Sequence, residues 1–74
     1  MREVMVFVRP AGGGWQVETA VSDAPLMFLS GAKAESAAHD LARRISRRGG
    51  SAAQVVVEDR LSQVVGSRRY PAVV

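Results

Sequence analysis

Apolar and polar residues alternate along several short stretches of the chain, which is the pattern of β-strands. In residues 4–9, valine occupies every second position, and Met5 and Phe7 lie between the valines. Apolar side chains on both faces indicate an interior strand. Residues 15–21 place Trp15 on one face and polar residues on the other, which is typical of a half-buried strand. Three further strands are predicted at residues 26–29, 53–58 and 61–65.

One amphipathic helix is predicted between the third and fourth strands. Ser30 is the expected N-cap, and the helix runs to about residue 47. Gly49 and Gly50 follow it, where a left-handed residue commonly ends a helix. Five apolar residues have the spacing of a single buried helix face: Ala34, Ala37, Ala38, Leu41 and Ile45.

The predicted order β-β-β-α-β-β favours a two-layer α+β fold, with a mainly antiparallel sheet and the helix packed on one face. Residues 10–14 predict a hairpin loop whose glycines supply positive φ angles. We expect one domain at residues 1–67 and a flexible C-terminal tail at residues 68–74. If Met5 and Phe7 lie on the uncovered face of the sheet, that apolar patch predicts a homodimer.

The composition predicts a thin core. The chain has 74 residues and no cysteine, which excludes disulfide scaffolds, thiol redox centres and cysteine-based zinc sites. Of its 35 apolar residues, 23 are alanine or valine. A single core in so short a chain rarely supplies more than about 3–5 kcal/mol of stability. We therefore expect the large apolar residues to serve folding or a subunit contact.

Charge is distributed unevenly along the chain. The net charge is +3, but residues 1–40 sum to −2 and residues 41–74 to +5. A basic region of this kind attracts phosphates and other anions. The sequence contains neither a secretory signal pattern nor an apolar stretch long enough to span a membrane, so we expect a cytoplasmic protein that does not bind membranes.

Several of these features occur together in a known pattern. They are the hairpin Gly14-Trp15-Gln16-Val17, an alanine-rich helix from Ala34 to Arg43, a valine-rich strand and a turn containing Asp59. Over residues 4–70 this pattern resembles a family of small bacterial proteins known only as a domain of unknown function. The resemblance implies the fold above and brings no activity with it. The family has Asp-Gly at the last turn, where this chain has Asp59-Arg60.

A second resemblance concerns topology. Three strands followed by a helix that begins near Lys33 are similar to the end of a double-stranded-RNA-binding domain. Those domains carry a cluster of lysines at the start of that helix and a further helix before the first strand. This chain has only Lys33 there and no leading helix, so we interpret the similarity as topological.

Three sets of residues suggest a catalytic, metal-binding or phosphate-binding site, but their surroundings in the predicted fold argue against each one. Ser36, His39 and Asp40 are the residue types of a hydrolase triad, but they share an exposed helix face with no pocket. We expect Asp40 to pair with Arg44 instead. His39 is the only histidine, so no metal site is predicted. The glycines at 12–14 lead into a strand, whereas a phosphate-binding loop leads into a helix, so no cofactor is predicted.

Trp15 has two readings. An exposed tryptophan can stack on a base or a ligand. In a core this poor in large side chains, we interpret Trp15 as a structural anchor.

Arginines are the main candidates for a binding role. Four of them lie in the last turns of the helix, where they complement the negative end of its dipole. With the basic residues of the expected tail they form a possible phosphate or nucleic-acid footprint, which comprises Arg43, Arg44, Arg47, Arg48, Arg68, Arg69 and Tyr70.

Two functions follow as hypotheses. The first is a non-catalytic accessory or protein-interaction domain whose partner is another protein or a second copy. The alternative is weak, sequence-independent nucleic-acid binding through the arginines. We do not expect an enzyme, because no polar cluster that would form a pocket can be assembled from these residues.

Overall fold

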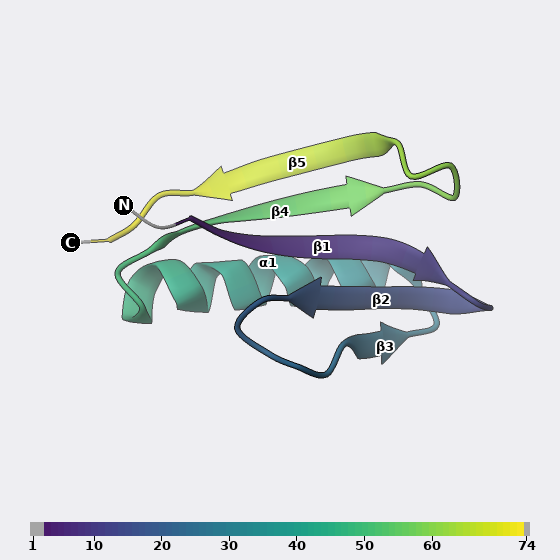
Figure 1. The fold of residues 1–74 in the computed structure, drawn as a ribbon, viewed down its shortest axis with the longest axis horizontal. Coiled ribbons are helices and arrows are strands. Elements are labelled where there is room, and N and C mark those ends of the chain that lie inside the picture. The colour runs from purple at the N-terminus through teal and green to yellow at the C-terminus, as the bar shows by residue number, and fades with distance from the viewer. Residues whose placement is uncertain (1–2, 74) are drawn as a thin grey trace.

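The computed structural model, which describes residues 3–73, places one helix against one face of a five-stranded sheet (Figure 1). The predicted order of elements and the α+β class are confirmed. The elements are β1 (Glu3–Ala11), β2 (Gly14–Thr19), β3 (Leu26–Phe28), α1 (Gly31–Arg48), β4 (Ala52–Glu58) and β5 (Val64–Tyr70).

The strands lie in the order β3-β2-β1-β4-β5, so β1 occupies the centre of the sheet. Three of the four neighbouring pairs are antiparallel, as predicted, and β1 with β4 is parallel. A parallel pair needs a long crossover, and α1 provides it. The register sets Val6 beside Val55 and Val8 beside Val57, which joins the two valine-rich strands across the middle of the core.

The core lies between α1 and the sheet. Its largest fully buried side chains are Val6, Val8 and Val55. On the helix, the buried residues recur every fourth position: Ala34, Ala38, Ala42 and Ser46. These small side chains allow the helix to approach the sheet closely. The predicted buried face is therefore rotated, since Leu41 and Ile45 are half-buried at the margin of the core rather than at its centre.

Both ends of α1 are capped as the sequence predicts. The Oγ of Ser30 accepts a hydrogen bond from the backbone N–H of Lys33 at 3.3 Å. At the other end, the N–H of Gly49 donates to the carbonyl of Ile45 at 2.9 Å, and Gly50 adopts a φ of +64°. A left-handed residue just after the C-cap is the usual stop for a helix.

Two glycines of the β1–β2 hairpin serve different purposes. Gly12 has a φ of +58°, which fits the predicted role of glycine in the turn. Gly14 has an ordinary φ, but a Cβ there would lie 2.4 Å from the carbonyl oxygen of Phe28 on β3. Gly14 therefore permits the close approach of β2 and β3.

Two of the first three strands end earlier than predicted. β2 stops at Thr19 rather than residue 21, and Val21 is 58% exposed beyond it. β3 stops at Phe28, and Leu29 follows as a 94% exposed side chain. Apolar residues predicted to lie in strands thus remain on the surface at this side of the sheet.

The last strand begins later than the predicted range of 61–65. Asp59 organises the turn before it, because its Oδ1 accepts hydrogen bonds from the N–H groups of Leu61 at 2.8 Å and Gln63 at 3.0 Å. Ser62 adopts a φ of +61° in the same turn. Residues 61–63, which the alternating pattern predicts to be strand, therefore belong to this turn.

The predicted tail at residues 68–74 is wrong for its first three residues, which belong to β5. Tyr70 pairs with Ala53 of β4 and is only 8% exposed. The N–H of Val73 then donates to the carbonyl of Ser46 at 3.1 Å, so the chain stays on the helix after the strand ends. A buried aromatic ring at the end of β5 holds this segment in place. Val74 lies outside the described residues.

Candidate functional site

The predicted arginine footprint divides among separate surfaces. Arg43 and Arg68 lie on the β5 side of α1, with their guanidinium carbons 5.8 Å and 4.9 Å from the centre of the Tyr70 ring. Arg44 and Arg48 line a groove together with Val4 of β1. Arg47 is exposed on the outer side of the helix. Because neighbouring helix positions differ by about 100°, these residues point in different directions.

Arg69 lies on yet another surface. Successive strand residues point to opposite faces of a sheet, so Arg69 faces away from the helix while its neighbours face toward it. Its Nε lies 2.6 Å from Oε2 of Glu3 on the uncovered face. Of the seven predicted residues, the structure therefore brings Arg43 and Arg68 to a third, Tyr70, and leaves the other four apart from it.

Tyr70 is the centre of that contact. Its hydroxyl oxygen lies 2.8 Å from Nδ1 of His39, and the two rings meet edge to face at 5.8 Å. Nη1 of Arg43 lies 3.5 Å from the same hydroxyl. The side chains of this group are engaged with one another, which indicates a structural contact between α1 and β5.

The expected pairing of Asp40 with Arg44 is wrong. Asp40 pairs with Arg43, one residue nearer, and this hydrogen bond raises the pKa of the Arg43 guanidinium. Because His39 turns toward Tyr70 and Ser36 is exposed, the three residue types of a hydrolase triad are not assembled.

Trp15 packs against the margin of the core and remains half-buried. Its ring lies beside the start of α1, where a Cβ on Gly31 would be 3.0 Å from Trp15 Cε2. This contact fits the structural reading of Trp15, and its energetic role as an anchor stays a prediction.

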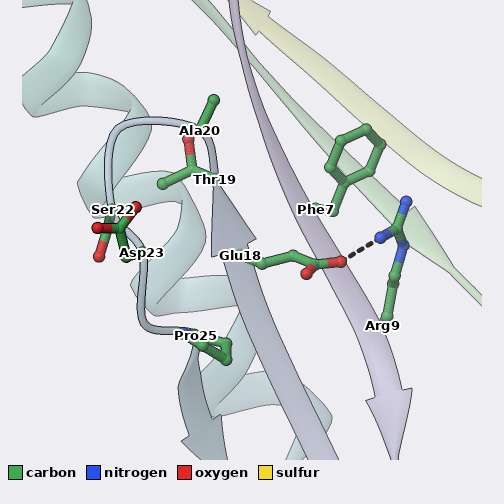
Figure 2. A pocket seen from close by; sticks show the side chains of 8 residues that line it. All are labelled: Phe7, Arg9, Glu18, Thr19, Ala20, Ser22, Asp23 and Pro25. Atoms are coloured by element: carbon green, nitrogen blue, oxygen red, sulfur yellow. Dashed lines mark hydrogen bonds and ion pairs between the residues drawn. The ribbon is translucent and has the colours of Figure 1, made fainter.

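A shallow hollow of about 280 Å³ opens where β2 turns toward β3 (Figure 2). Phe7, Arg9 and Glu18 line one part of it, and Asp23 and Pro25 line the loop side. The Arg9 guanidinium is bound to Glu18 within the hollow, as the dashed line shows. The cation that faces this hollow is thus already neutralised.

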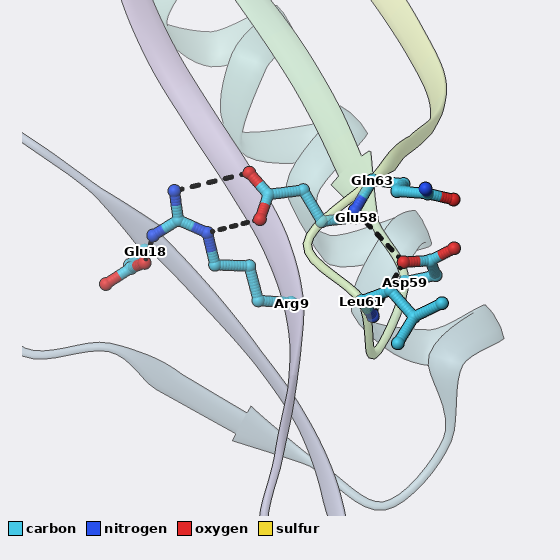
Figure 3. Close-up of polar contacts among 6 residues, drawn as sticks. All are labelled: Arg9, Glu18, Glu58, Asp59, Leu61 and Gln63. Carbon is cyan, nitrogen blue, oxygen red and sulfur yellow. Dashed lines mark hydrogen bonds and ion pairs between the residues drawn. The ribbon is translucent and has the colours of Figure 1, made fainter.

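Arg9 also binds a second carboxylate on the other neighbouring strand (Figure 3). Its Nε lies 3.1 Å from Oε1 of Glu58, and its Nη2 lies 3.3 Å from Oε2. The bidentate bond to Glu58 and the bond to Glu18 raise the pKa of Arg9. The guanidinium also covers the Phe7 ring at 4.2 Å. The sequence analysis did not predict this network. The available signal was that Arg9, Glu18 and Glu58 carry opposite charges and lie near the ends of three strands.

The uncovered sheet face is therefore a mixed surface. Met5 and Phe7 alternate with the buried valines of β1 and lie on this face, where both are half-buried. Arg9 covers Phe7, and Arg69 with Glu3 forms a further ion pair near the start of β1. The apolar patch expected around Met5 and Phe7 is interrupted by these charges.

The edge of the sheet at β3 has a different character and is the candidate site. Leu26 and Met27 are 52% and 60% exposed, and Leu29 lies next to them on the surface. Residues 24–32 contain no charged side chain. No further strand covers β3 within the described part of the chain. We call Leu26, Met27 and Leu29, with the free strand edge, the β3 edge.

Comparison with known proteins finds no matching family, no matching curated protein and no matching solved structure. The resemblances to a family of small bacterial proteins and to RNA-binding domains thus stay predictions. Within residues 3–73, no helix combines the length and apolar character needed to cross a membrane. Among these described residues, no three or more histidine, aspartate or glutamate side chains lie close enough together to hold a metal ion.

Proposed function

We propose that this domain is a non-catalytic protein-interaction module that associates with a second copy through the β3 edge. The observation that carries the proposal is the exposure of Leu26, Met27 and Leu29 beside an unpaired strand in an uncharged stretch of chain. An unpaired strand offers backbone donors and acceptors to another strand, and proteins usually protect such edges with charges. The β3 edge lacks such charges, and its protection is limited to its short length of three residues.

The opposite edge of the sheet supports this choice by contrast. β5 also exposes apolar side chains, with Val64 and Val65 more than half accessible. It carries Arg68 and Arg69 as well, and like charges brought together across a strand pair repel each other. Self-pairing through β5 is therefore disfavoured, whereas identical β3 edges can meet about a two-fold axis without repulsion.

The expected association is weak. β3 has three residues, so the contact falls at the small end of protein interfaces, below the roughly 800 Å² per partner of a standard one. The dimer should therefore form only at high protein concentration.

Sedimentation velocity over a concentration series tests the proposal. The wild-type mass should rise toward that of a dimer, and Met27→Lys should keep the protein monomeric by placing a charge on the edge. Leu61→Lys is the matched control, because Leu61 is a 78% exposed leucine near the other edge. A wild-type protein that stays monomeric throughout, or an equal loss of association in both variants, would contradict the proposal.

A further inference from the structure

A groove of about 420 Å³ lies between the C-terminal half of α1 and the start of β1. We call it the α1–β1 groove. Its lining combines four apolar side chains with two arginines, namely Val4, Val21, Leu41, Ile45, Arg44 and Arg48. It lies on the flank of the helix opposite the Tyr70 contact.

The strand register leaves this groove uncovered. Pairing between β1 and β2 ends at Val6 with Thr19, while β1 extends back to Glu3. Residues 3–5 of β1 therefore have no partner on the β2 side, and Val4 is left half-buried. A second hollow of about 500 Å³ shares Val4 and Val21 and continues toward Met5 and Phe7.

Two parallel rows of helix residues face the groove. Leu41 and Ile45 are one turn apart and form its apolar side. Arg44 and Arg48 are also one turn apart and form its rim. Small residues occupy the centre of the helix interface, so Leu41 and Ile45 lie at its margin, where they are partly accessible.

The two rim arginines combine a place beside an apolar groove with the lack of an ion pair among residues 3–73, and they share only the second feature with Arg47, Arg60 and Arg68. Arg9, Arg43 and Arg69 each bind a carboxylate. Arg44 and Arg48 have no carboxylate within ion-pair distance among residues 3–73. The helix dipole alone can explain why arginines lie in the last turns of α1. It does not explain why an apolar groove lies beside them.

We propose that the α1–β1 groove binds a short acidic amphipathic segment of a partner protein. Its apolar side chains would cover Leu41, Ile45, Val4 and Val21, and its carboxylates would pair with Arg44 and Arg48. Opposite charge at the rim of an apolar contact gives both orientation and specificity. This surface is separate from the β3 edge, so the inference stands apart from self-association.

An NMR titration of ¹⁵N-labelled protein tests the groove directly. The probe is a blocked synthetic peptide of repeated Glu-Leu-Leu-Glu units, added to the Met27→Lys variant so that self-association does not interfere. Saturable shifts should appear at Val4, Val21, Leu41 and Ile45. Peptides of Lys-Leu-Leu-Lys and Glu-Ser-Ser-Glu should bind at least about tenfold more weakly. The first lacks the carboxylates and the second lacks the apolar side chains.

Charge-reversal variants decide whether the rim arginines carry the binding. Arg44→Glu should weaken binding of the Glu-Leu-Leu-Glu peptide by about tenfold or more. Arg47→Glu is the matched control, because it makes the same charge change on the same helix without lining the groove. It should change the affinity by less than about twofold.

Three results would overturn the proposal. Equal losses in Arg44→Glu and Arg47→Glu would show a general charge effect. Binding of Glu-Ser-Ser-Glu as tight as that of Glu-Leu-Leu-Glu would show that the apolar side chains contribute nothing. Tighter binding of a short DNA or RNA duplex with the same shifts would assign the arginines to phosphate recognition instead.

Discussion

The hydroxyl oxygen of Tyr70 lies 2.8 Å from Nδ1 of His39, and this contact joins the end of β5 to the middle of α1. The ring beside it is almost fully buried, and the guanidinium of Arg68 stacks over it at 4.9 Å. The C-terminal residues therefore complete one side of the core.

Tyr70→Phe should lower the free energy of unfolding by about 1 kcal/mol, because it removes a hydrogen bond and keeps the ring. Urea denaturation measures the change. A double-mutant cycle with His39→Ala isolates the contact, and the two substitutions should be less than additive. Strict additivity would mean that the two side chains do not interact in solution.

Trp15→Ala should destabilise the domain by about 3 kcal/mol, at the low end for a large aromatic residue because Trp15 is only half-buried. If the core supplies about 3–5 kcal/mol, that loss leaves at most about 2 kcal/mol, so the variant should be only marginally stable. Circular dichroism and urea denaturation measure it. A variant that folds with unchanged stability would instead favour the ligand-stacking reading of Trp15.

Gly14→Ala should destabilise the protein by about 1–3 kcal/mol, because the new Cβ collides with the backbone of β3 and forces β2 and β3 apart. Gly13→Ala is the control. A Cβ at position 13 meets no atom within 4 Å, and its φ is not in the left-handed region. Thermal and urea unfolding should separate the two variants clearly, and equal stability would contradict the close approach at Gly14.

Asp59→Ala should destabilise the β4–β5 turn by about 1–2 kcal/mol, because two backbone N–H groups lose their shared acceptor. Asp59→Asn keeps a side-chain oxygen at the same place and should recover most of that loss. The exchange rates of the backbone amide hydrogens in β5 measure this destabilisation locally. Equal destabilisation by both substitutions would indicate that charge, rather than the acceptor, matters in this turn.

Local signals in the sequence predict most of the fold. Alternation located the valine strands, and Ser30 with Gly49 and Gly50 marked the ends of the helix. The start of β5 could not be found in this way, because the bonds of the Asp59 side chain and the left-handed Ser62 shape a turn that alternation does not detect. The burial of Tyr70 depends on contacts with α1, which are remote in sequence.

The candidate surfaces were harder to predict. The arginines are close in sequence, but a strand sends Arg68 and Arg69 to opposite faces, and a helix turns Arg43 away from Arg44. The groove beside Arg44 depends on the parallel pairing of β1 with β4 and on where β2 stops. The apolar exposure of Leu26, Met27 and Leu29 followed from β3 lying at an edge, which only strand order reveals.

The parallel pairing at the centre of the sheet also constrains how the chain can fold. β1 is made first, yet one of its two neighbours is β4, which follows the eighteen-residue helix. The hairpin of β1 and β2 can form early, but the middle of the sheet stays open until residues 52–58 have left the ribosome. Contacts between residues so far apart in sequence slow folding. A nascent chain halted before residue 52 would thus present the valine-rich strand β1 with one side unpaired.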